Sequence, residues 1–178
     1  GQFARLMEMV LLGTKNDFYT LREEAAIMRM YLEIQRKRWR ETFETDFFME
    51  PALEEGDFYC PSLLMQPLAE NAIEHGLLPK SDLPRRLSIR WIRSENNLLC
   101  TVEDTGIGLQ PIVESPEADA SHIGLDNVRS RIKIINALYH FDIKLTVGET
   151  PGGGVSITIF LPLISKPPSL QPSKTKAI

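Results

Sequence analysis

The chain has 178 residues, of which 43% are hydrophobic and 25% charged, with a net charge of −4 and a pI of about 5.5. This composition is typical of a globular protein with one medium-sized domain. Its acidic balance argues against a nucleic-acid-binding module, which usually carries a basic surface. Because no apolar run is long enough to cross a bilayer, we expect no membrane span within the chain.

The first predicted element is a helix over residues 21–40. Apolar side chains such as Ile27 and Tyr31 recur there at helical spacing, with charged residues on the other faces. Thr20 and Glu23 have the spacing of a capping box, which predicts that the helix begins directly after Thr20. A helix with one apolar face packs on something, here either the rest of the chain or an upstream segment.

Further strands and helices alternate along the chain. The expected strands cover residues 43–49, 86–93, 97–104, 143–147 and 155–161, and the expected helices cover residues 61–76 and 125–139. Loops are expected at residues 51–57 and 105–123. This order predicts a two-layer α/β sandwich, with a mixed sheet covered by helices on one face. The second loop is long for a compact domain, and such loops are often lids.

This pattern divides the chain into three parts. Residues 1–40 are expected to be a helical connection to another segment, and residues 41–164 are expected to be the main domain. Residues 165–178 are polar and contain prolines, so we expect a disordered tail.

The helix at residues 61–76 carries the first candidate site. Asn71 and His75 lie four residues apart and therefore share a face. The amide oxygen of Asn71 is a suitable ligand for Mg²⁺, and His75 could donate to a phosphate oxygen, although both could also be ordinary solvated residues. Pro67 is unexpected inside a helix, and Gly76 is a typical helix-ending residue.

The second candidate is the sequence EDTGIGL at residues 103–109. Asp104 ends an apolar strand, so its carboxylate could accept a hydrogen bond from the exocyclic amine of adenine. Gly106 and Gly108 would allow the backbone to approach a ligand closely. An ordinary turn explains the same pattern about equally well.

The third candidate is HIGLDNVRSRI at residues 122–132, where the loop is expected to run into a helix. Free backbone N–H groups around Gly124 and Leu125 would then form a phosphate site. Arg129 and Arg131 lie off the apolar stripe, and a solvated basic face explains them better than phosphate contacts do. The glycine turn PGGG at residues 151–154 could be no more than a hairpin loop.

A P-loop and a dinucleotide-binding glycine fingerprint are both absent. The succession of these four weak motifs instead resembles the nucleotide-binding domain shared by histidine kinases, type II topoisomerases, Hsp90 chaperones and MutL mismatch-repair proteins. It is most similar to LytS/YesM-like sensor histidine kinases. The resemblance extends over roughly residues 20–163 and is carried by the segments LREEAAIMRMYLEIQRKRW, PSLLMQPLAENAIEHG, VEDTGIGL, HIGLDNVRSRI and PGGGVSITIFLPL.

The resemblance implies the Bergerat-type ATP-binding fold, with ATP and Mg²⁺ as cofactors and residues 109–123 as a mobile ATP lid. It implies that Asn71 binds the metal and that Asp104 recognises adenine. Glu70, beside Asn71, is a candidate to orient or deprotonate the acceptor imidazole, or it is a surface carboxylate. The expected nucleotide-binding residues are Asn71, His75, Asp104, Gly106, Gly108, Gly124 and Leu125.

Three positions depart from the pattern of these relatives. Pro67 stands where the ATP-hydrolysing members carry a water-activating glutamate, which favours phosphoryl transfer to a protein over hydrolysis. His122 replaces the first glycine of the usual lid motif. Val155 replaces a threonine that often lies near the adenine carboxylate.

The acceptor motif of this class, a segment resembling NPHFLFN, does not occur in the chain. None of His75, His122 and His140 has an acceptor context. We therefore expect the phosphoacceptor histidine on a segment absent from this chain, in a parent kinase that is a homodimer. The resemblance also implies a response regulator as partner, no nucleic acid, and a membrane sensor whose catalytic domain is cytoplasmic.

Two other functions remain open. A catalytically degenerate module that binds nucleotide or scaffolds a response regulator would account for His122 and Val155. A serine kinase of the anti-sigma type shares the fold but would lack the helix at residues 21–40.

Overall fold

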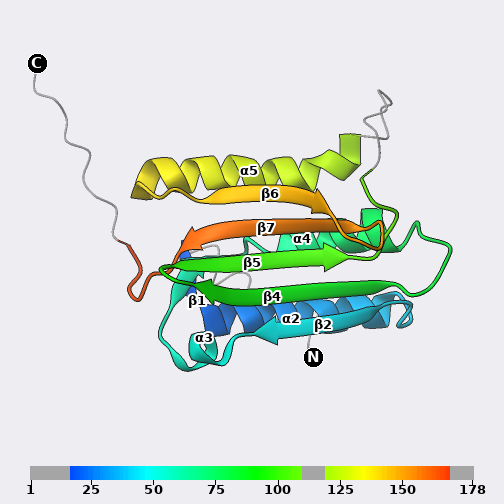
Figure 1. Ribbon diagram of the computed structural model, residues 1–178, viewed down its shortest axis with the longest axis horizontal. Coiled ribbons are helices and arrows are strands. Elements are labelled where there is room, and N and C mark those ends of the chain that lie inside the picture. The colour runs from blue at the N-terminus through cyan, green and yellow to red at the C-terminus, as the bar shows by residue number, and fades with distance from the viewer. Residues whose placement is uncertain (1–16, 110–118, 169–178) are drawn as a thin grey trace, which may run out of the picture.

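The computed structural model describes residues 17–109 and 119–168, without the side chains of residues 119–123. Five strands form one sheet in the order β2-β4-β5-β7-β6 (Figure 1). They are β2 (Glu44–Met49), β4 (Arg86–Ser94), β5 (Asn97–Asp104), β6 (Lys144–Glu149) and β7 (Val155–Pro162). β2 and β4 are parallel and the other pairs are antiparallel, so the sheet is mixed, as the sequence predicts.

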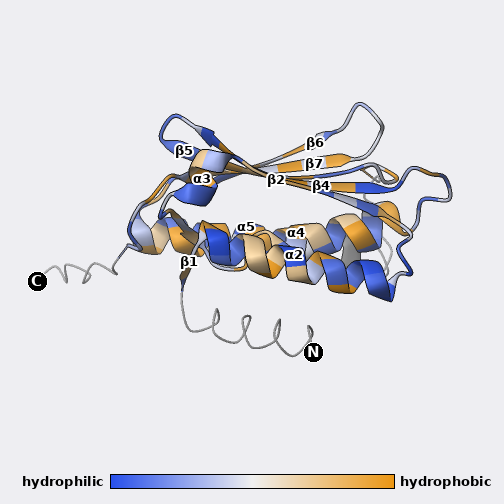
Figure 2. Ribbon diagram, turned by 90° about the horizontal axis from the view of Figure 1, so that it is seen from below, coloured by the Kyte–Doolittle hydropathy of each residue, from blue (hydrophilic) through white to orange (hydrophobic). Residues whose placement is uncertain are grey.

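The helices form a second layer on one face of this sheet (Figure 2). They are α2 (Leu21–Arg38), α4 (Gln66–Asn71) with the π-helical turn η1 (Ala72–Leu77), and α5 (Asp119–Tyr139), while α3 (Pro51–Glu55) is a short helix beside β4. A small antiparallel pair joins β1 (Phe18–Thr20) to β3 (Tyr59–Pro61). The predicted two-layer sandwich is confirmed. In the described part of the chain, no helix combines the length and the apolar character needed to cross a membrane.

Strand alternation explains where the core lies. Leu87, Ile89 and Trp91 of β4 are fully buried because every second side chain points toward the helices. On the opposite face, Thr101 and Thr158 of paired strands share a hydrogen bond of 3.1 Å between their hydroxyls. The core therefore fills the space between the sheet and the helical layer.

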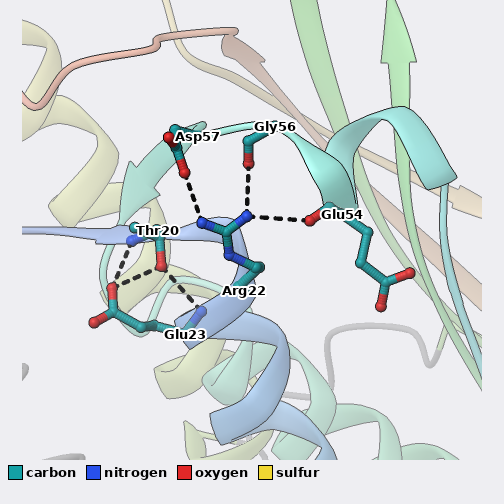
Figure 3. A network of polar contacts seen from close by, with 6 residues as sticks. All are labelled: Thr20, Arg22, Glu23, Glu54, Gly56 and Asp57. Atoms are coloured by element: carbon teal, nitrogen blue, oxygen red, sulfur yellow. Dashed lines mark hydrogen bonds and ion pairs between the residues drawn. The ribbon is translucent and has the colours of Figure 1, made fainter.

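Helix α2 begins where the capping box predicts. Thr20 Oγ1 accepts from the backbone N–H of Glu23, and the Glu23 carboxylate accepts from the backbone N–H of Thr20 (Figure 3). Arg22 in the same turn donates to the carbonyls of Glu54 and Gly56 and to the carboxylate of Asp57, which connects α2 to the end of α3 and to the segment after it. The apolar face of α2 belongs to the same core as the sheet.

Several predicted element bounds are wrong. Residues 51–57 are not entirely loop, because Pro51 begins the short helix α3, where a proline in the first turn loses no helical hydrogen bond. The helix predicted at residues 61–76 begins only at Gln66, since residues 59–61 pair with β1. Pro67 consequently lies in the first turn of α4 and breaks no helical bond there.

The predicted bounds of two other helix ends also differ. Gly76 does not end its helix but lies inside η1, which continues to Leu77. α5 begins at Asp119 rather than near Leu125, so Gly124 and Leu125 are within the helix and not at its free amino end. The loop expected at residues 105–123 is shorter by five residues, and its segment 110–118, most of the expected lid, lies outside the described residues, as do residues 1–16 and 169–178.

Glu24 of α2 is a charged side chain buried in the core, 2% exposed. Burial raises the pKa of its carboxyl from 4.5 to about 7, while backbone N–H groups of Leu63 and Met65 and the Arg131 guanidinium of α5 oppose the rise. The buried thiols of Cys60 and Cys100 lie close enough for the charge of Glu24 to raise their pKa further.

This shift predicts how stability depends on pH. Between about pH 4.5 and 7 the folded chain still holds a proton on Glu24 that the unfolded chain has released, so the free energy of unfolding should fall as the pH rises. The loss should be about 3 kcal/mol, and it should be absent in Glu24→Gln. Denaturant titrations at pH 5 and pH 8 measure this loss. An equal change in the free energy of unfolding between the two pH values in the wild type and the variant would refute the prediction.

Candidate nucleotide-binding site

A cavity of about 330 Å³ opens between the sheet and the layer formed by α4, η1 and α5. Most of its lining is apolar, with the polar side chains Asn71, His75 and Asp104 at separate points. The other lining residues are Ala72, Pro79, Val102, Ile107, Gly108, Leu109, Leu125, Val147, Val155 and Ile157. An apolar cavity of this volume with a few directed polar groups is typical of a small-molecule site.

Asp104 is the buried polar group of the cavity. It ends β5 and is 4% exposed. Its Oδ1 accepts from the backbone N–H of Gly106 at 2.7 Å and of Val155 at 3.4 Å. Within the described residues, its Oδ2 accepts no hydrogen bond from the protein. Burial raises the pKa of Asp104, and the two N–H donors and Lys80 oppose the rise. The side chain thus offers one carboxylate oxygen to a ligand that donates.

Close backbone approach holds this carboxylate in place. A Cβ at Gly76 would lie 2.9 Å from Asp104 Oδ1, and a Cβ at Gly154 would lie 1.9 Å from the backbone oxygen of Asp104. The Gly154 N–H donates to Thr150 Oγ1 at 2.9 Å, and that hydroxyl donates to the Asp104 carbonyl at 3.4 Å. The glycine turn before β7 is therefore more than a hairpin loop, because it closes around the end of β5.

The segment after Asp104 is fixed against η1. The N–H of Ile107 donates to the carbonyl of Gly76 at 3.1 Å, and Lys80 Nζ donates to the carbonyl of Thr105 at 2.5 Å. Gly108 has a φ of +77°, a left-handed conformation that suits glycine. Ile107 and Gly108 are thereby placed on the cavity wall.

Asn71 and His75 lie where α4 widens into η1. A π-helical turn is rare and often occurs at functional sites. Both side chains line the cavity, and they lie on one face of the helix as their spacing predicts. Gly124 of α5 packs against the Asn71 amide so closely that a Cβ there would lie 2.4 Å from Asn71 Oδ1. This contact joins the two helices at the cavity.

The structure brings five predicted residues to the cavity wall, namely Asn71, His75, Asp104, Gly108 and Leu125. Gly106 and Gly124 do not line the cavity, but Gly106 donates to Asp104 and Gly124 packs against the Asn71 amide. Glu70 is exposed and does not line the cavity. The pKa of the Tyr31 hydroxyl on α2 is raised first by the burial of Tyr31 and then by the charge of Glu70. Sequence reasoning missed Val102 and Ile157, although strand alternation marks both as inward-facing.

The described residues do not form a metal site made of protein side chains alone. No group of three or more His, Cys, Asp or Glu side chains gathers anywhere in the described residues. Mg²⁺ that is bound to phosphates keeps several waters and needs only one or two protein oxygens, and the Asn71 amide oxygen on the cavity wall would fit that requirement.

Comparison with known protein families decides the assignment. The model of the histidine kinase-, DNA gyrase B- and HSP90-like ATPase family matches residues 61–165, which is more than half of the chain and includes the whole cavity. The chain belongs to this family. It is accordingly an ATP-binding domain of the histidine kinase-like ATPase type.

The curated relatives of this ATPase domain include sensor histidine kinases. The chain is 38% identical over 121 residues to the sensor histidine kinase YesM of Bacillus subtilis, and the alignment covers 67% of this chain and 20% of YesM. It is 32% identical over 155 residues to the uncharacterised YwpD of B. subtilis, covering 81% of this chain and 50% of YwpD. The chain thus spans half or less of the length of these relatives.

Solved histidine kinase structures share the fold. The catalytic domain of ThkA aligns with a TM-score of 0.55 at 14% identity, covering 82% of this chain and 95% of that one. The histidine kinase AdeS of Acinetobacter baumannii aligns with a TM-score of 0.53 at 16% identity, covering 90% and 76%. At these identities the likeness establishes the architecture alone.

Proposed function

We propose that this ATPase domain transfers the γ-phosphoryl group of ATP to a histidine on a segment absent from this chain. The observation that carries the proposal is the buried Asp104, which lines an apolar cavity and whose Oδ2 accepts no hydrogen bond from the described residues. That oxygen is suited to accept from the exocyclic amine of adenine, while the apolar walls contact the faces of the base.

Three polar residues would act on the phosphate side. The Asn71 oxygen would bind Mg²⁺, and His75, on the same wall, would donate to a phosphate oxygen. Glu70, exposed beside Asn71, would orient the incoming imidazole or accept its proton. Bound Mg-ATP would supply the phosphoryl group, so the residues of the chain would position this group and neutralise its negative charge.

Pro67 supports transfer over hydrolysis. It lies one turn before Asn71 and cannot act as a base toward water. A site that binds ATP without activating water preserves it for a protein acceptor. We further propose that the parent protein is a homodimeric membrane sensor, with this domain in the cytoplasm and a response regulator as phosphate acceptor.

The test is a transfer assay. The chain is mixed with radiolabelled Mg-ATP and a fragment bearing the acceptor histidine of the same parent. Acid-labile label on the fragment is the expected result. Binding without transfer would favour the alternative, a nucleotide-binding module without catalytic activity. The observation that supports this alternative is Val155, which has no hydroxyl where many relatives carry a threonine.

Asn71→Ala tests the metal assignment. We expect Mg-ATP affinity to fall about tenfold, because one metal ligand is lost, while ATP affinity in excess chelator should stay unchanged. Isothermal titration calorimetry with and without Mg²⁺ separates the two. Asn127→Ala, an exposed position on α5, is the matched control. An equal loss with and without Mg²⁺ would reject Asn71 as the ligand.

A further inference from the structure

The turn between β3 and α4 is held from two sides. Leu63 lies in this turn and has a φ of +52°, a left-handed conformation that is unfavourable for a leucine. Met65 is the N-cap residue of α4, and its side chain makes no capping hydrogen bond. A turn with these two features needs support from elsewhere in the fold.

Glu24 supports the turn from α2. One carboxylate oxygen accepts from the N–H of Leu63 at 3.0 Å, and the other accepts from the N–H of Met65 at 3.5 Å. The carboxylate is separated from Leu63 by 39 residues of sequence, so the contact is a tertiary one. A buried carboxylate is costly unless it is used, and here both of its oxygens bind the same short turn.

Arg131 supports the turn from α5. Its guanidinium donates to the carbonyl of Leu63 at 3.3 Å and to Ser62 Oγ at 3.2 Å. Leu63 is therefore bound through its N–H by α2 and through its carbonyl by α5. The expectation that Arg131 belongs to a solvated basic face is wrong, since the side chain is half-buried in this contact.

Helices α4 and α5, which are joined at the turn, also contact each other at the proposed nucleotide cavity. α4 leads from the turn to Asn71, and α5 leads back from Arg131 to Gly124, which packs on the Asn71 amide. The distance between these helices at the cavity thus depends on how they are joined at the turn. Figure 1 shows α4 between α2 and α5.

We propose that Glu24 and Arg131 are positioning residues for the ATP site: by binding the two sides of Leu63, they set the placement of α4 against α5 and so of Asn71. The inference rests on the proposed nucleotide site. It makes α2 part of the binding apparatus and not merely a connection to another segment.

Glu24→Gln is the decisive variant. Glutamine has the same size but a single acceptor oxygen, so one of the two N–H groups in the turn would face an NH₂ group instead. At pH 8 we expect the dissociation constant for Mg-ATP to rise about tenfold, while the unfolding midpoint does not fall, because a buried charge has been removed. A residue with only a structural role would lose stability and affinity together.

The neighbouring Glu23→Gln is the matched control. Glu23 is exposed, and glutamine also completes a capping box, so this change removes one charge from the same turn of α2 without reaching Leu63. Unchanged affinity in Glu24→Gln would overturn the inference, and so would an equal loss in Glu23→Gln.

Arg131→Lys completes a double-mutant cycle, because lysine keeps the charge but replaces the two separate nitrogens that reach Leu63 and Ser62 by a single ammonium on a shorter side chain. The combined variant should lose less affinity than the product of the two single losses, since each change alone already releases Leu63. Independent effects would contradict a shared role.

Hydrogen exchange separates this inference from the proposed function. In the nucleotide-free chain, Glu24→Gln should speed exchange of the amides in the turn and α4, and leave β5 unchanged. If the wild type binds no nucleotide, the proposed function fails, and the exchange result still decides whether Glu24 positions α4. Equal exchange in the variant and the wild type would refute it.

Discussion

Replacing Asp104 by Asn is expected to weaken Mg-ATP binding by a factor of about 100. The Oδ2 position would become an amide that donates, and it would face the donating amine of adenine in a buried cavity. An unmatched buried donor pair costs about 3 kcal/mol. Oδ1 would still accept from Gly106, so the fold should persist. Calorimetry and a thermal unfolding scan measure the two effects.

The nucleobase provides a second readout for this variant. Guanine carries a carbonyl oxygen where adenine carries its amine, so the wild type should prefer ATP over GTP and Asp104→Asn should narrow that preference. Glu103→Gln is the matched control, because Glu103 is the preceding residue on β5 but bonds Ser156 on the opposite face of the sheet. Unaltered ATP affinity in Asp104→Asn would remove Asp104 from the adenine site.

Gly154→Ala is expected to destabilise the fold by about 3 kcal/mol and to abolish measurable ATP binding. The added methyl group would lie 1.9 Å from the backbone oxygen of Asp104. Backbone cannot rotate away as a side chain can, so the turn before β7 and the end of β5 would have to separate. This change would displace the Asp104 carboxylate. Chemical denaturation and calorimetry measure the two losses.

Gly152→Ala provides the control in the same turn. A Cβ at Gly152 would meet nothing within 4 Å, and its φ is not left-handed. Stability and affinity should therefore remain close to those of the wild type. Equal stability and equal ATP affinity in the two alanine variants would contradict the prediction that Gly154 holds Asp104 in place.

Local sequence signals predicted much of the fold. The capping box of Thr20 and Glu23 marked the start of α2, and apolar alternation marked β5 over its full length. Errors arose where tertiary contacts override local patterns. Pro61 resembles the first residue of a helix but pairs with Phe18, a partner 43 residues earlier, and spacing within one segment cannot reveal such pairing.

The site was predicted less completely than the fold. The spacing of Asn71 and His75 predicts only that they share a helix face, and the resemblance to histidine kinases is what places Asp104 in the same site. Gly76 was interpreted as a helix end, because a glycine required for contact with a distant side chain has the same local sequence as one that ends a helix. The roles of Glu24 and Arg131 depend on burial and on contacts across the helical layer, which composition and periodicity do not encode.

The position of β5 has a mechanical consequence for the ATP site. β5 lies in the middle of the sheet and is paired along its length with β4 on one side and β7 on the other. Central strands are usually the last part of a domain to open in local fluctuations. The Asp104 carboxylate is thus attached to a central strand, whereas Asn71 and His75 lie where α4 passes into a π-helical turn, a rare geometry that often occurs at functional sites. In the proposed ATP site, fluctuations of the folded chain should therefore change the space expected for the phosphates more than the space expected for the base.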